Sequence, residues 1–174
     1  MDIILVDEAD NEVGTMEKIE VHQKALLHRA FSIFIFNEAG EMLLQKRAAQ
    51  KYHSAGLWTN ACCSHPAPGT DTLQAAGKRL EEEMGFNVLL EKAFHFIYKA
   101  PFDNGLTEHE FDHVFIGKYD GEIQPNPVEV SDFCFRSLED IELEIQKNPG
   151  EFTVWFKIAF PKVVAHFARI SLTT

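Results

Sequence analysis

Five residues of this chain combine imidazole and carboxylate groups, which suit a divalent transition metal. They are His22, His28, His65, Glu108 and Glu110. Glu108 and Glu110 are two positions apart, so on a β-strand both side chains project from one face. Adjacent carboxylates repel each other, and a cation between them relieves that repulsion. Because no two of these histidines have a tight ligand spacing, separately solvated side chains remain the alternative from spacing alone.

A cysteine close to a histidine is the second candidate, in residues 59–66 (TNACCSHP). A structural zinc site usually needs four ligands with paired CxxC or HxxxH spacing, and the chain has neither. A thiol beside acidic groups keeps its pKa near or above the free value of about 8.5, so it stays protonated at pH 7. That state suits a proton donor better than a thiolate nucleophile. A buried cysteine that acts only as a small apolar residue is the alternative.

Residues 78–86 (KRLEEEMGF) approach the Nudix signature, a helix that reads R-E-apolar-x-E-E-x-G-apolar and binds metal and diphosphate. Arg79 and Glu83 are one helical turn apart, so one could hold a phosphate oxygen and the other a Mg²⁺. Lys78 stands where the motif has Arg, and Arg79 where it has its first Glu. Because a cation cannot ligate a metal, diphosphate binding without hydrolysis is expected. A solvated charged face is the alternative.

Composition bounds the kind of protein. The 174 residues are 45% hydrophobic and include 15 Phe, 3 Tyr and 2 Trp, enough for one domain over residues 1–174. The net charge of −11 disfavours nucleic-acid binding, so an anionic ligand requires local cations or a metal. No apolar run approaches the ~20 residues of a membrane span, and the N-terminus lacks signal-peptide features. Three cysteines, two of them adjacent, form no disulfide framework, which predicts a cytoplasmic protein.

The elements that must position these residues are strands and helices mixed without a regular βαβ repeat. Strands are predicted at residues 3–6, 29–36, 41–46, 87–100, 110–119 and 131–135, with 29–36 and 41–46 forming a hairpin. Helices are predicted at residues 71–84, 138–147 and 153–170, with Gly85 and Ser137 as caps and a break or bend at Pro161. Residues 47–70 are predicted to be a long functional loop. The mixture predicts an α+β (mixed α/β) fold.

Together these residues resemble the type 1 isopentenyl-diphosphate isomerases, a Nudix-fold family. The resemblance covers nearly the whole chain: Lys18 and His22, the strand at 29–36, residues 56–60 (GLWTN), 63–66 (CSHP) and 108–110 (EHE), and Trp155. It implies a Nudix-like fold with a mixed central sheet flanked by helices. It also implies a cytoplasmic enzyme of isoprene biosynthesis, which converts isopentenyl diphosphate to dimethylallyl diphosphate by protonation and deprotonation, without a redox cofactor.

The resemblance further implies a role for each site residue. Cys63 and Glu110 are the acid/base pair, Tyr98 hydrogen-bonds within that pair, and the ring of Trp155 stabilises the carbocation. His22, His28, His65, Glu108 and Glu110 hold a divalent metal, for which Mn²⁺, Zn²⁺ and Mg²⁺ are all admissible. Glu83 and the Cys63 carbonyl bind a Mg²⁺ with the substrate diphosphate. The diphosphate itself meets Lys18, Arg47, Lys51 and Arg79.

Three alternatives to this isomerase remain on the sequence alone. They are a Nudix-type diphosphate hydrolase, a non-catalytic metal- or phosphate-binding module, and an isomerase acting on another allylic diphosphate. The expected partner is a small-molecule diphosphate, with no nucleic acid and no membrane, and the expected state is a monomer or weak dimer. Because two metal ligands organise the segment through His28, residues 1–28 are expected to be disordered without metal.

Overall fold

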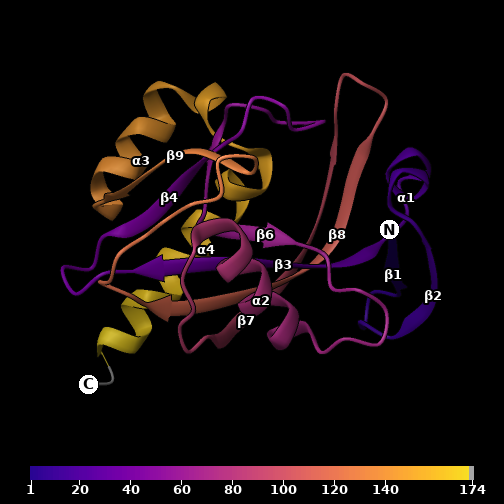
Figure 1. Cartoon of the computed structure of the whole chain (residues 1–174), viewed down its shortest axis with the longest axis horizontal. Coiled ribbons are helices and arrows are strands. Elements are labelled where there is room, and N and C mark those ends of the chain that lie inside the picture. Colours follow the sequence, from indigo (N-terminus) through magenta and orange to yellow (C-terminus); the bar gives the residue numbers. More distant parts are fainter. Residues whose placement is uncertain (173–174) are drawn as a thin grey trace.

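The computed structural model describes residues 1–172, whose strands form one nine-stranded mixed sheet with helices on both faces (Figure 1). The strands are β1 (Asp2–Val6), β2 (Glu12–Glu17), β3 (His28–Phe36), β4 (Met42–Arg47), β5 (Trp58–Thr59), β6 (Cys62–Ser64), β7 (Glu91–Pro101), β8 (Thr107–Lys118) and β9 (Val130–Arg136). The helices are α1 (Lys18–Lys24), α2 (Thr72–Met84), α3 (Leu138–Lys147) and α4 (Val154–Leu172), with a 3₁₀ turn η1 (Pro149–Glu151). Within this described part of the chain, no helix is long and apolar enough to cross a membrane.

Strand β3 is the centre of the sheet and the element on which the site is built. It runs parallel to β8 along its whole length, from His28 opposite Glu110 to Phe36 opposite Lys118. Its other edge pairs antiparallel with β6, where Ser32 lies opposite Cys63. The strand is apolar on both faces, as a strand covered from both sides requires. Strand β3 therefore lies between β6 and β8 and fixes the position of both.

Helices α2 and α4 cover opposite faces of β3. Phe31, Ile33 and Ile35 pack in one core cluster with Leu80 and Met84 of α2. Phe34 and Phe36 pack in the other with Phe156, Phe160 and Val163 of α4. The period-2 alternation of a strand thus fills two cores. The N-terminal β1, β2 and α1 lie together at the right of Figure 1, beside the β7–β8 hairpin.

The caps predicted at Gly85 and Ser137 are confirmed, and Ser137 accepts a hydrogen bond from the Asp140 amide at 3.1 Å. Asp71, predicted to be the first residue of the α2 helix, is instead its N-cap and accepts a hydrogen bond from the Gln74 amide at 3.0 Å. Gly85 ends α2 with a φ of 76°, and a Cβ there would lie 2.3 Å from the Gln124 carbonyl oxygen. Only glycine fits this close approach.

Four local predictions from the sequence are wrong in part. Residues 47–70 contain β5 and β6, which are defined by their pairing partners rather than by their own composition. Strands β3 and β4 pair only at Phe36 and Met42, because β4 turns away to pair with β9. The strand predicted to begin at Asn87 begins at Glu91. Helix α4 continues through Pro161 without a break, and Phe156, Phe160 and Val163 are buried on both sides of it.

Strand β2 and helix α1 also had no sequence prediction. Strand β2 is largely exposed, including its hydrophobic residue Val13, so its pattern carries little signal. Helix α1 has only seven residues, and its amide groups at Ile19 and Glu20 are capped by the Glu17 carboxylate. Both depend on contacts with the rest of the fold.

Candidate active site

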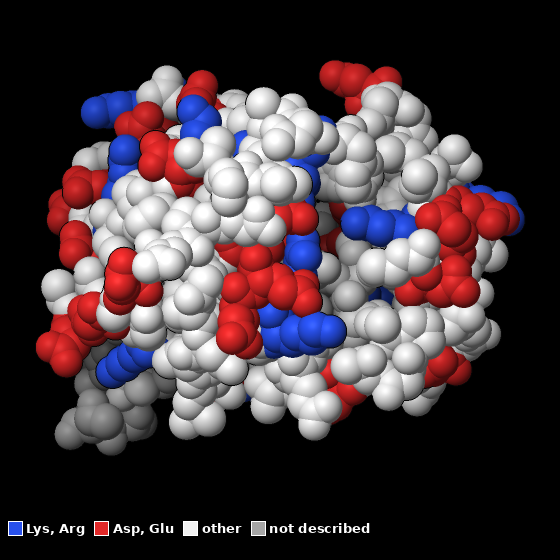
Figure 2. All heavy atoms as spheres, viewed as in Figure 1, with Lys and Arg blue, Asp and Glu red and all other residues white. Residues whose placement is uncertain are grey.

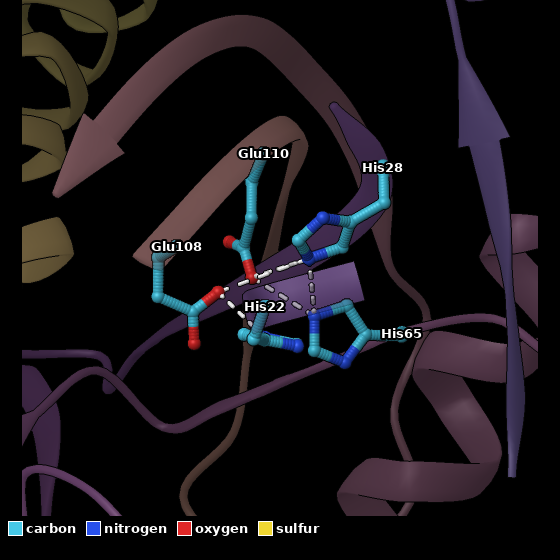
Figure 3. A group of neighbouring side chains, drawn as sticks. All are labelled: His22, His28, His65, Glu108 and Glu110. Atoms are coloured by element: carbon cyan, nitrogen blue, oxygen red, sulfur yellow. Dashed lines mark hydrogen bonds and ion pairs between the residues drawn. The ribbon is translucent and has the colours of Figure 1, made fainter. Parts of the chain in front are cut away.

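The five predicted metal ligands converge on one point. His22 comes from α1, His28 begins β3, His65 follows β6, and Glu108 and Glu110 lie on one face of β8. One ligand atom from each lies within 4.8 Å of all the others (Figure 3). The parallel register of β3 and β8 is the direct cause, because it sets His28 opposite Glu110. The separately solvated alternative is therefore wrong for these residues.

Backbone carbonyls orient two of the imidazoles. His22 Nδ1 donates to the Lys18 carbonyl at 2.5 Å, and His28 Nδ1 donates to the Leu26 carbonyl at 2.9 Å. Their Nε2 lone pairs then face the cluster, the arrangement that usually accompanies metal-ligating histidines. His28 Nε2 is 3.2 Å from His65 Nε2, so a proton or a cation must separate them. The donor set fits a divalent metal ion.

The protonation states of the cluster also suit a metal. Burial lowers the pKa of His65 to about 4, which keeps it a neutral imidazole at pH 7. Burial opposes the ionisation of Glu108, but hydrogen bonds from His22 and His53 outweigh it and hold the pKa of Glu108 well below its usual value. The pKa of His22 is raised, because the hydrogen bond and charge of Glu108 outweigh its burial. A proton therefore competes with a metal for His22 more strongly than it would at an ordinary histidine.

A cavity of about 520 Å³, its open mouth included, lies beside the cluster. Its lining contains His65, Glu108 and Glu110 together with Glu83. It also contains every other residue predicted for catalysis or diphosphate binding, namely Cys63, Tyr98, Trp155, Lys18, Arg47, Lys51 and Arg79. The structure therefore brings all the predicted site residues together, with His22 and His28 on the cluster's inner side.

Acid and base groups face this cavity in defined states. Tyr98 and Glu110 are direct cross-strand partners, and the Tyr98 hydroxyl donates to Glu110 Oε2 at 2.7 Å. Burial raises the pKa of Tyr98 well above its usual value, so it remains a donor. Burial, reinforced by the charges of Glu83 and Glu110 against that of Arg47, raises the pKa of Cys63 to about 12. The site thus offers a protonated thiol and a hydrogen-bonded carboxylate.

The four basic residues predicted to bind diphosphate each contact a carboxylate or an aromatic ring. Arg79 contacts Glu83 Oε1 at 2.8 Å and Glu129 Oε1 at 3.1 Å, and Lys51 also pairs with Glu129. Lys18 lies 5.0 Å from the centre of the Tyr52 ring, and Arg47 lies 5.2 Å from the centre of the Trp155 ring. In Figure 2, basic atoms border the hollow to the right of centre.

Sequence reasoning missed several residues that contact this site, three of which interact with its charged groups. Gln45 donates to Glu83 Oε2 at 2.9 Å, Glu129 pairs with the cations, and His53 Nε2 lies 3.0 Å from Glu108 Oε1. None belongs to a motif with recognisable spacing. The one signal in the sequence is that His53 lies within residues 47–70, the predicted functional loop.

The fold and the site define a class of protein. Residues 26–156 match the family model described as NUDIX domain. The fold is shared with DR0079 from Deinococcus radiodurans, at a TM-score of 0.70 and 18% identity over 84% of this chain and 90% of that one. A MutT protein from Methanosarcina mazei Go1 shares it at a TM-score of 0.65 and 19% identity, over 78% of this chain and 91% of that one. At such identities the likeness concerns the fold alone.

Nearer relatives are more specific. An isopentenyl-diphosphate Delta-isomerase from Pectobacterium atrosepticum is 49% identical over 93% of this chain and 90% of its own length. One from Serratia proteamaculans is 51% identical over 88% of this chain and 86% of its own length. An isopentenyl-diphosphate Delta-isomerase 2 from Photorhabdus laumondii is 53% identical over 89% and 88%, respectively. The chain belongs to this isomerase family, which confirms the resemblance and the Nudix-like α+β fold.

Proposed function

We propose that this protein isomerises isopentenyl diphosphate to dimethylallyl diphosphate in isoprene biosynthesis. The observation that carries the proposal is the shared cavity in which the Cys63 thiol, the Glu110 carboxylate and the Trp155 ring meet four cations. The names of relatives 49–53% identical support the same activity. An enzyme for a small soluble diphosphate also suits the cytoplasm and a monomer or weak dimer.

The reaction adds one proton to the terminal alkene carbon and removes one from the carbon on the other side of the tertiary centre. One member of the Cys63–Glu110 pair delivers the first proton and the other accepts the second. Tyr98 fixes Glu110 Oε2 through its hydroxyl, so the carboxylate keeps one orientation. A thiol is a weak acid for an alkene, so the developing cation needs stabilisation. The face of the Trp155 ring supplies it, at about 0.5–2 kcal/mol.

The remaining residues bind and orient the substrate. Lys18, Arg47, Lys51 and Arg79 would contact the diphosphate, and Glu83 with the Cys63 carbonyl would hold a Mg²⁺ against it. The five-residue cluster would hold Mn²⁺, Zn²⁺ or Mg²⁺. When bound, these ions would supply positive charge that offsets the diphosphate and the clustered carboxylates.

A Nudix-type hydrolase is the less favoured function. The signature helix carries Arg79 where the hydrolase motif has a glutamate, and Arg79 is paired with Glu83 and Glu129. A cation at that position cannot contribute to a metal cluster that activates water. The names of the close relatives also favour isomerisation.

Proton NMR in D₂O with isopentenyl diphosphate and Mg²⁺ tests the proposal directly. The expected result is dimethylallyl diphosphate with deuterium incorporated and no inorganic phosphate. A Cys63→Ala variant should stay folded and lose several orders of magnitude of rate. Intact, undeuterated substrate after metal reconstitution would refute the isomerase, and release of phosphate would establish the hydrolase instead.

A further inference from the structure

The two oxygens of Glu108 face different partners. Oε2 points into the cluster, 3.1 Å from His22 Nε2 and 3.8 Å from His28 Nε2. The other oxygen points away from the cluster in Figure 3. Oε1 lies 3.0 Å from Nε2 of His53, which is not one of the five clustered ligands. Because only 3% of the Glu108 side chain is exposed, an outer oxygen without such a donor would be costly to bury.

The imidazole of His53 is held firmly in this orientation. Its ring stacks on Phe102 at a centroid distance of 4.9 Å and an interplanar angle of 12°. Tyr52 and Trp155 meet it nearly at right angles, at 4.4 and 5.8 Å. Since a carboxylate oxygen accepts, Nε2 carries a proton, and Nδ1 lies 3.3 Å from the Ser54 hydroxyl. The ring therefore presents a donor to Glu108 and has little freedom to turn.

The backbone of His53 is anchored as well. Its carbonyl oxygen accepts a hydrogen bond from Arg47 Nη2 at 3.2 Å. Lys51 and Tyr52, which precede it, line the same cavity. The segment between β4 and β5 thus touches the metal cluster through one side chain and borders the proposed diphosphate site with the others.

We propose that His53 is a positioning residue for the metal centre: it holds Glu108 Oε1 outside the cluster and leaves Oε2 as the single ligating oxygen of that carboxylate. Hydrogen bonds of this outer kind fix the orientation of first ligands, and their loss typically reduces metal affinity about 10- to 100-fold. His53 also connects the metal centre to the segment carrying Lys51. Its contribution to catalysis rests on the proposed function, whereas its contribution to metal affinity does not.

The test compares metal binding by the purified full chain and its variants. His53→Phe keeps a stacked ring but has no donor, whereas His53→Gln offers an amide donor. His95→Phe is the matched control, because His95 also packs face to face with a phenylalanine, Phe111, but lies outside the cavity lining. Zn²⁺ affinity is measured by chelator competition, and Co²⁺ alone is used to record the visible absorption spectrum of the centre.

We expect His53→Phe to lower Zn²⁺ affinity about 10- to 100-fold and to change the Co²⁺ spectrum. His53→Gln should restore most of both, and His95→Phe should alter neither. Unchanged affinity and an unchanged spectrum in His53→Phe would overturn the inference. If that variant does not fold, His53→Asn, whose amide is too short to reach Glu108, takes its place with the same two outcomes. Because the metal-binding measurements contain no substrate, their result stands even if the protein shows no isomerase activity.

Discussion

Cys63 is predicted to be an unreactive thiol although it lies in an open cavity. Burial raises its pKa to about 12, against the charge of Arg47 and with smaller contributions from Glu83 and Glu110. A raised pKa means that the proton is retained up to that pH, so the nucleophilic thiolate is scarce. Iodoacetamide, which reacts with the thiolate, is therefore expected to modify Cys63 slowly.

The size of the effect follows from two opposing factors. At pH 8 a pKa of about 12 leaves about 1 thiolate in 10⁴, whereas a thiol at the model value of 9.0 is about one-tenth ionised. This difference alone is about 1,000-fold. A more basic thiolate is more nucleophilic, with a Brønsted coefficient of about 0.4–0.5, which recovers about 15- to 30-fold. The net expectation is alkylation about 30- to 60-fold slower than in the unfolded chain.

The pH dependence separates ionisation from simple shielding. Alkylation of Cys63 is followed by peptide mass spectrometry between pH 7 and 10, in the folded chain and in urea. In the folded chain the logarithm of the rate should rise with a slope near one over the whole range. In urea it should level off near pH 9, and a shielded thiol of ordinary pKa would level off there too. A rate that levels off near pH 9 or below in the folded chain would refute the proposed proton-donor state of Cys63.

Three further predictions concern the groups around the cavity. Tyr98→Phe removes the hydroxyl that holds Glu110, so kcat in the NMR assay should fall about 10- to 150-fold with little change in KM. A rise in KM as large as the fall in kcat would contradict a positioning role. Glu83→Gln should raise the Mg²⁺ concentration needed for half-maximal activity at least about tenfold, while the metal content of the five-residue cluster, measured by elemental analysis, stays unchanged. Removing the metal with a chelator should speed proteolysis within residues 1–28. Acidification should do the same, because the pKa of His22 is raised and a proton competes with the metal there. Equal cleavage with and without metal would exclude metal-dependent ordering.

The sequence was informative where a feature is local. The β-branched and aromatic residues of β3 indicate a strand whatever surrounds them. Asp71, Gly85 and Ser137 mark helix ends through hydrogen bonds within a few residues. Such features depend on short stretches of backbone, so composition and spacing are enough to find them.

The metal cluster could not be derived from spacing. His28 and Glu110 are 82 positions apart and become neighbours only because β3 and β8 pair in parallel with one register. His22 depends on α1, a seven-residue helix with no strong pattern. The family resemblance supplied this set of ligands because it carries information about tertiary contacts. His53 lay outside the motifs that carried the resemblance, so nothing in the sequence identified its contact with Glu108.

The electrostatics of the cavity explain how a chain of net charge −11 can hold a diphosphate in the proposed way. Exposed charges farther away than about 8 Å are largely screened at physiological ionic strength, so the nearest groups dominate. Arg79 and Lys51 converge on Glu129, whose carboxylate holds both cations at the cavity. A diphosphate can take over these contacts with more charge and more acceptor oxygens than one carboxylate. Glu129 therefore preorganises Arg79 and Lys51, and the net negative charge of the chain does not prevent a diphosphate from binding at the proposed site.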